Sequence, residues 1–318
     1  MSIGKVQINN LNLMQGEITA VENHLLFVGP GKGDKVGKLL TVNTDSDLSG
    51  VLAGADGLLA QVTAARDNGG QNWSASVMLY DAEGGGVASW SDAVDEAMEL
   101  AKVEGVVLTD PLSSVSDIEA MQAKSERIMA KYMRPVWFAG RAPAFDADSQ
   151  SWEEYATAIK PLTADVAADA CLVTPTIWGP ELGTLMGRLC NAAVTVADSP
   201  MRVATGALVG SWMERPADKS GRRLDMSVLE GLDKARFSVP QWYPDYEGMY
   251  WADGNVLDVN GGDFQVIENV RVIMKAMRRV YPLAVARIAD RRFNSTPASI
   301  AQNKTYFMRP LREMSRSV

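Results

Sequence analysis

The sequence predicts an α/β fold with a mostly parallel sheet, flanked by helices. From His24 to about residue 210, short apolar runs alternate with helical patterns of about ten to eighteen residues. Strands separated by such helices require right-handed crossovers, which bring the strands together in parallel. A smaller α+β region near the C-terminus and an extended arm at each end complete the expected architecture.

The expected strands are short apolar runs bounded by turn residues or helix stops: 25–29, 76–80, 106–108, 136–139 and 171–174. Two expected helices begin at capping boxes, in which a serine and a glutamate three residues later satisfy each other's backbone amides. These boxes are Ser116 with Glu119 and Ser151 with Glu154. Further helices are expected over 56–66, after Ser91 and after Pro180.

Changes in composition divide the chain into four expected regions. Residues 1–20 form an N-terminal arm, 21–215 the α/β domain, 216–303 a smaller domain and 304–318 a C-terminal arm. The central boundary falls in a polar stretch, residues 211–225, that contains a proline and a glycine.

Both ends of the chain are predicted to be extended. Near the start, apolar residues alternate with polar ones, with one interruption that a bulge would absorb. No hairpin partner follows nearby, so the backbone groups of this arm must bond elsewhere. The apolar residues that carry the prediction are Val6, Ile8, Leu11 and Leu13 in one arm and Tyr306 and Phe307 in the other.

Charge is distributed unevenly along the chain. The net charge is −8, yet residues 265–318 hold eleven Lys and Arg against three Asp and Glu. This region contains an amphipathic helical pattern with cations on one side, and the stripe continues beyond Pro282. Such asymmetry favours an acidic partner for the basic end, although a solvated helix face is the alternative. The stripe comprises Arg271, Lys275, Arg278, Arg287 and Arg291.

No arrangement of catalytic residues is visible. The single histidine, His24, begins an apolar run, and no Gly-x-Ser-x-Gly elbow occurs. The two cysteines, Cys171 and Cys190, are expected to be buried thiols. Residues 29–38 lack the spacing of a Walker loop or a dinucleotide fingerprint. We therefore expect no enzyme activity and no cofactor.

Metal binding and membrane insertion are not expected either. Asp253, Asp258 and Asp263 suggest calcium, but Phe264 stands where an EF-hand would need an acid. No run of eighteen apolar residues occurs, and the first five residues lack a signal core. The negative net charge disfavours general nucleic-acid binding. A soluble protein made in the cytoplasm is expected.

Several segments, taken in order, resemble contractile tail sheath proteins, and more narrowly a short phage sheath family long catalogued as a domain of unknown function. The resemblance covers both ends and the middle of the chain. The segments are 4–12 leading into 24–29, 183–190 with 199–200 and 206–210, 250–254 followed by 262–264 and 268–272, and 309–315.

This resemblance implies a structural subunit of a phage virion, assembled in the host cytoplasm. Sheath subunits form hexameric rings stacked helically around a tail tube, and contraction of the sheath drives genome delivery. The two arms would add strands to a sheet in neighbouring subunits, and the basic stripe would face the tube. Expected partners are other copies of the chain, the tube, the baseplate and the tail terminator.

Three alternatives remain open. The chain could be the sheath of a phage-derived injection device, which only genome context would separate from a phage sheath. It could be an α/β enzyme, which a polar pocket at the carboxyl ends of the parallel strands would favour. It could be another tail component such as a tube protein, although the repeated α/β pattern disfavours the small β-barrel usual for a tube.

Overall fold

The structure is a computed structural model that describes residues 21–84, 86–210, 214–291 and 294–317. Its centre is a seven-stranded sheet with the strand order β2-β3-β1-β4-β5-β6-β9. The sheet strands are β1 (Leu25–Pro30), β2 (Leu39–Asn43), β3 (Ser74–Tyr80), β4 (Gly105–Pro111), β5 (Trp137–Ala144), β6 (Ala168–Thr176) and β9 (Val256–Leu257). A separate hairpin consists of β7 (Pro240–Tyr243) and β8 (Tyr246–Trp251).

The five central strands run parallel, which confirms the predicted fold class. Strand β1 pairs in parallel with both β3 and β4, and the sheet continues in parallel through β5 to β6. Strands β2 and β9 are antiparallel and lie at the two edges. Because these central strands are buried on both faces, they read as continuous apolar runs rather than alternating patterns.

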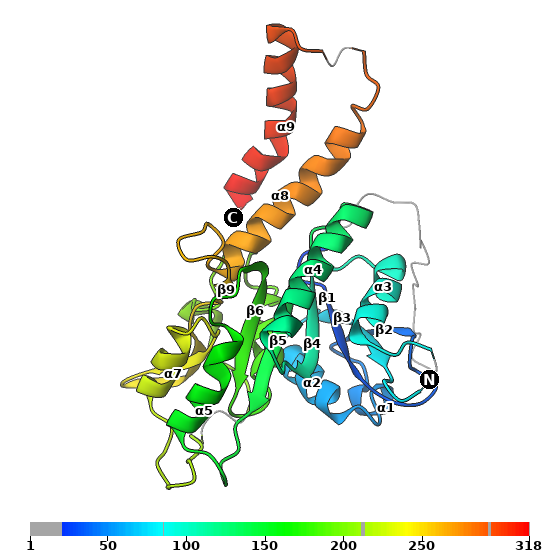
Figure 1. The fold of residues 1–318 in the computed structure, drawn as a ribbon. Coiled ribbons are helices and arrows are strands. Elements are labelled where there is room, and N and C mark those ends of the chain that lie inside the picture. Colours follow the sequence, from blue (N-terminus) through cyan, green and yellow to red (C-terminus); the bar gives the residue numbers. More distant parts are fainter. Residues whose placement is uncertain (1–20, 85, 211–213, 292–293, 318) are drawn as a thin grey trace, which may run out of the picture.

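Helices cover both faces of the sheet (Figure 1). One face carries α3 (Trp90–Leu100), α4 (Val115–Tyr132), α5 (Trp152–Ile159) and α7 (Met226–Asp233); the other carries α1 (Leu48–Val51), α2 (Asp56–Gly69) and α6 (Glu181–Leu189). The capping box at Ser151 and Glu154 is present as predicted. The one expected at Ser116 lies two residues earlier, where Ser114 and Asp117 satisfy each other's backbone.

Helices α2 and α6 pack with their backbones in close contact. A Cβ atom added at Gly183 would lie 2.0 Å from the carbonyl oxygen of Gln61, and one added at Gly187 would lie 2.2 Å from that of Ala65. Two glycines one turn apart therefore form a flat strip on α6 against which α2 packs. Any larger side chain at either position would push the helices apart.

The polar stretch near residue 215 does not separate two cores. Leu229 and Leu232 of α7 belong to the same apolar cluster as the central strands, and β9 pairs with β6. Within this stretch Leu224 is itself buried in that cluster, and the chain on either side of the stretch returns to the same sheet. A boundary placed at residue 215 from composition alone is thus not visible in the packing.

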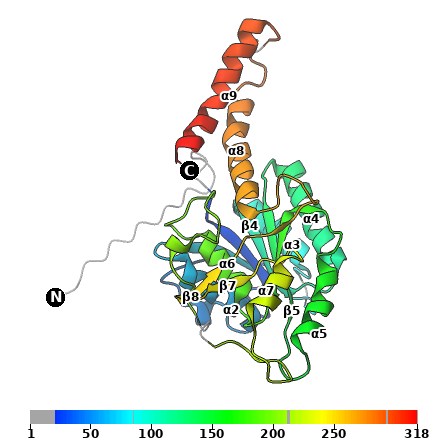
Figure 2. The same cartoon turned by 90° about the vertical axis from the view of Figure 1, so that its left-hand side faces the viewer.

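The last two helices project from the body as a hairpin (Figures 1 and 2). Helix α8 (Ile267–Val285) starts at the sheet, and α9 (Pro297–Ser317) turns back along it. The expectation of an extended segment over 304–318 is therefore wrong for residues 304–317, which are helical. The physical reason is tertiary: α9 lies against α8 and buries Met314, which a solitary strand could not do. Pro282 lies inside α8 and does not end it.

Candidate assembly surface

The α8–α9 hairpin exposes an unusual amount of apolar surface. Beyond its first turns, α8 leaves the body, and α9 packs mainly against α8. Ile288 is 75% exposed and Ile300 is 56% exposed. Large exposed apolar areas on a protein mark interaction surfaces. The exposed apolar residues of the hairpin are Ile273, Met277, Tyr281, Val285, Ile288, Ile300 and Met308.

Arg271, expected on an exposed basic stripe, is instead fully buried at the base of α8. Its guanidinium Nε lies 2.7 Å from Glu104 Oε1, and its Nη2 lies 3.0 Å from Glu104 Oε2. Its remaining donors reach the backbone oxygen of Leu189 and the side-chain oxygen of Asn23, each at 2.9 Å. All three nitrogens of the guanidinium thus donate within the protein, and Arg271 cannot face a tube.

Glu104 is the centre of this cluster, which we call the Glu104 node and which comprises Asn23, Glu104 and Arg271. The Asn23 backbone N–H donates to Glu104 Oε2 at 2.6 Å, and the Glu104 backbone N–H donates to the His24 carbonyl at 2.8 Å. Burial by itself would raise the pKa of Glu104. The charge and hydrogen bonds of Arg271, with the Asn23 N–H, hold that pKa below its usual value.

The other stripe residues do not share one free face. Arg278 Nη2 lies 3.2 Å from Glu22 Oε1, and both side chains are largely buried. Arg287 Nη1 lies 2.8 Å from Asp290 Oδ2, while Lys275 is half-buried and Arg291 is exposed. The helical spacing that predicted the stripe is real, but ion pairs with Glu22 and Asp290 occupy two more of its five cations.

Two of the six predicted arm residues lie in the part of the chain that the structure describes. Tyr306 and Phe307 lie on α9 with their ring centroids 5.3 Å apart, and the Arg287 guanidinium lies 4.3 Å from the centroid of the Tyr306 ring. The contact between Arg287 and Tyr306 joins α9 to the segment that directly follows α8. Val6, Ile8, Leu11 and Leu13 lie outside the described residues.

Sequence reasoning missed Glu104 and Asn23, as well as the exposed Arg312 and Arg316 of α9. A charged residue directly before the apolar strand at Gly105 is a signal of a buried ion pair. Its partner lies 167 residues away, so the sequence alone offers no means of choosing among the cations.

One edge of the sheet is open within the described part of the chain. Strand β9 is covered because Val256 N–H donates to Gln265 O, whereas β2 pairs only with β3. Thr44 N–H bonds Trp73 O, and antiparallel strands alternate inward and outward groups. The N–H and C=O groups of Leu39 and Thr41 therefore face away from the sheet.

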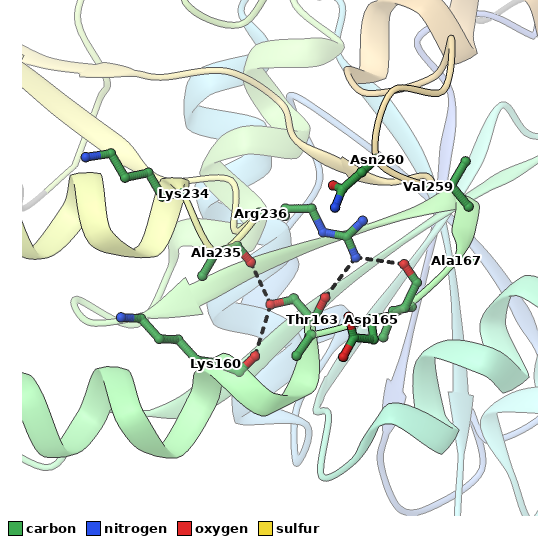
Figure 3. Close-up of a pocket in the computed structure, with 11 residues that line it drawn as sticks. Lys160, Thr163, Asp165, Ala167, Lys234, Ala235, Arg236, Val259 and Asn260 are labelled. Atoms are coloured by element: carbon green, nitrogen blue, oxygen red, sulfur yellow. Dashed lines mark hydrogen bonds between the residues drawn. The ribbon is translucent and has the colours of Figure 1, made fainter.

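Two pockets lie at the carboxyl ends of the parallel strands, where an enzyme of this fold would bind a ligand. The one at the ends of β1 and β3 has a volume of about 340 Å³ and is lined in part by Lys32, Asp56 and Glu83. At the carboxyl ends of β3 and β4, the Tyr80 hydroxyl donates to Asp110 Oδ2 beside a cavity of about 140 Å³. Burial raises the pKa of Asp110. A larger pocket of about 460 Å³ lies at the opposite, amino end of β6 (Figure 3). Ligands of open α/β sheets bind at the carboxyl ends of strands.

The larger pocket is organised by a structural arginine. Arg236 donates to the backbone oxygens of Thr163, Val166 and Asp258, at 2.8, 2.7 and 2.5 Å. Lys160 and Lys234 extend away from that guanidinium (Figure 3). Arg236 thus joins the start of β6 to the segment after β9, and its guanidinium is directed at backbone rather than at a ligand.

Two further observations concern the described residues only. No group of three or more His, Cys, Asp or Glu there is placed to hold a metal ion. No helix among them is both long and apolar enough to cross a membrane.

The fold is that of contractile sheath proteins. The sheath of the extracellular contractile injection system PVC in its contracted state aligns over 99% of this chain and 82% of its own, with a TM-score of 0.63 and 11% identity. The contracted helical sheath of the anti-feeding prophage aligns over 100% and 84%, with a TM-score of 0.59 and 16% identity. A sheath tail protein from Desulfitobacterium hafniense aligns over 98% and 89%, with a TM-score of 0.54 and 10% identity.

The sequence defines the family more narrowly. The DUF2586 N-terminal domain matches residues 3–255 and the DUF2586 C-terminal domain matches residues 263–318, so the chain belongs to the DUF2586 family. It is 44% identical, over 98% of its length and 84% of the relative's, to a protein of Haemophilus phage HP1 (strain HP1c1) assigned as a tail sheath protein. The chain is thus a tail sheath homologue with a contractile-sheath fold.

Proposed function

We propose that this protein is the sheath subunit of a contractile phage tail, a virion component that stacks in hexameric rings around a tail tube. The observation that carries the proposal is the α8–α9 hairpin, which projects from the body and exposes seven large apolar side chains among its described residues. A hairpin of this kind suits burial against neighbouring copies. The absence of a recognisable reaction centre fits a structural rather than an enzymatic role.

Links between subunits would come from both ends of the chain. The apolar alternation of residues 1–20 suits strand addition, and the open edge of β2 offers the backbone groups that such a strand would bond. At the other end, α9 would serve as the C-terminal link in helical form. Its main attachment is to α8, which would let it reposition against a neighbour without disturbing the core.

The tube and the baseplate are the proposed external partners, with the tail terminator at the far end of the sheath. With Arg271 buried, exposed cations of the hairpin such as Arg291, Arg312 and Arg316 would contact an acidic tube. Exposed ion pairs contribute only about 0–1 kcal/mol each. Many weak, screened contacts would hold a sheath on a tube that it must later release. A solved baseplate of the anti-feeding prophage contains a chain of similar fold, which supports association with a baseplate.

Contraction is proposed to release free energy stored in a metastable extended lattice, without nucleotide. Subunits would move as nearly rigid bodies while the terminal links keep the lattice connected. Contraction of purified sheaths that required ATP would contradict this mechanism.

Electron microscopy of the protein expressed alone tests the proposal. We expect cogwheel discs or long tubes from the full chain. A variant lacking residues 1–20 should remain a folded monomer that does not polymerise. Tubes formed by the truncated protein would show that these residues are not a required link, and a full chain that stays monomeric at all concentrations would count against the sheath function.

A second candidate is the sheath of a phage-derived injection device. It is favoured by the fold likeness to the PVC and anti-feeding prophage sheaths. Neighbouring genes decide between the two: capsid and terminase genes indicate a phage, and toxin genes without a capsid indicate a device.

A further inference from the structure

The Glu104 node joins three segments that are far apart in the chain. Asn23 is the third residue after residues 1–20, Glu104 immediately precedes β4, and Arg271 lies in the second turn of α8. Five hydrogen bonds connect these segments, all between 2.6 and 3.0 Å. The root of the N-terminal segment and the base of the hairpin are thus fixed to each other and to the sheet through one carboxylate.

Stability alone does not explain a charged cluster at this position. Arg271 and Glu104 are both fully buried, and the nearby pair of Glu22 and Arg278 is also largely buried. A buried ion pair is often no more stabilising than well-packed apolar residues of similar volume, because desolvation opposes the attraction. The ion pair instead fixes the relative orientation of the segments that it joins, because each of its hydrogen bonds tolerates only a narrow range of distance and angle.

The backbone at Asn23 also points to a defined exit for the preceding residues. Asn23 has φ of +66°, in the left-handed region that asparagine adopts more readily than most residues. Both its backbone N–H and its side-chain oxygen bond within the node. One residue earlier, Glu22 pairs with Arg278 on the next turns of α8. Glu22 and Asn23 are therefore both fixed to α8, one through Arg278 and the other through Arg271.

We propose that the Glu104 node is a clamp that sets the angle between the N-terminal segment and the α8–α9 hairpin, so that Asn23, Glu104 and Arg271 are positioning residues for assembly. The inference builds on the proposed function, in which these two parts contact different neighbours. The angle between two such connections determines the twist and rise of a helical polymer. Tension applied to one connection would pass to the other through the node.

The test replaces the ion pair with apolar residues, using the double variant Glu104→Leu with Arg271→Met. The control removes the partly buried pair between Lys124 and Asp95, 2.8 Å apart on α4 and α3, by Lys124→Met with Asp95→Ala; the Lys124 side chain is buried and that of Asp95 is 43% exposed. We expect both variants to keep the wild-type circular dichroism spectrum. The node variant should lose amide protection at residues 22–24 in hydrogen exchange and form polymers of altered twist and rise, while the control matches wild type in both measurements.

Unchanged protection at residues 22–24 in the node variant would overturn the inference, and so would polymers with wild-type helical parameters. Hydrogen exchange is measured on the monomer, so it tests the clamp even if the wild-type chain fails to polymerise. That failure would refute the sheath function instead. If the double variant does not fold, Arg271→Lys replaces it, because lysine keeps the charge but cannot bond both Glu104 oxygens in the fork geometry of arginine. The same loss of protection is then expected.

Discussion

Removing Arg271 alone offers a quantitative test of how the Glu104 node contributes to folding. The substitution Arg271→Met leaves the Glu104 carboxylate fully buried, with the Asn23 N–H as its remaining donor in the node. Breaking a buried pair by removing one partner costs about 3–5 kcal/mol. An unfolding entropy of about 2.1 cal/mol/K per residue gives roughly 0.7 kcal/mol/K for this chain. The expected fall in Tm is therefore about 4–7 °C at pH 7.

The effect should depend on pH with a definite sign. In the wild type the folded pKa of Glu104 is lowered, so its contribution to stability is present above the unfolded pKa and is lost as the pH falls through the folded pKa. Without Arg271, burial is unopposed, and we expect the folded pKa to rise above the unfolded value. The variant then loses stability as the pH rises through that raised pKa. The difference in free energy of unfolding between the wild type and Arg271→Met should therefore become smaller as the pH is lowered from 7 to 5.

Thermal unfolding measures the fall in Tm, and urea unfolding followed by tryptophan fluorescence measures the free energy of unfolding at each pH. The Glu104→Leu, Arg271→Met double variant is the matched control and should recover most of the stability lost in Arg271→Met, because no buried charge remains. A single variant within about 1 kcal/mol of wild type at pH 7, or a gap independent of pH, would refute the assigned ion pair.

Three other substitutions test separate parts of the structure. Gly183→Ala should cost about 1–3 kcal/mol in urea unfolding, since its Cβ would overlap the carbonyl oxygen of Gln61, whereas Gly231→Ala, with open space around it in α7, should be neutral or slightly stabilising. Thr41→Pro removes an N–H that faces away from the sheet, so this variant should fold but no longer polymerise. The control variant Thr41→Ala should both fold and polymerise. Polymers formed by the proline variant would show that the β2 edge does not pair with a strand of a neighbouring copy. Ending the chain before residue 297 should leave the urea midpoint of the body nearly unchanged, because α9 packs mainly on α8, and should abolish assembly; a large stability loss would mean that α9 belongs to the core.

Local patterns in the sequence were sufficient to predict the central architecture. Strand burial, helix periodicity and caps depend on neighbouring residues, so the parallel sheet and the helix after Ser151 could be predicted from short windows.

Tertiary structure decided which features are exposed and which are buried. Spacing alone places Arg271, Lys275 and Arg278 on one side of a helix. Arg271 and Arg278 are nevertheless buried, because they form ion pairs with Glu104 and Glu22, which are distant in the chain. Residues 304–317 contain no strong local determinant of helix or strand, and packing along α8 made them helical. Helical periodicity determines which side chains share a face, but only the tertiary structure determines which residues that face contacts.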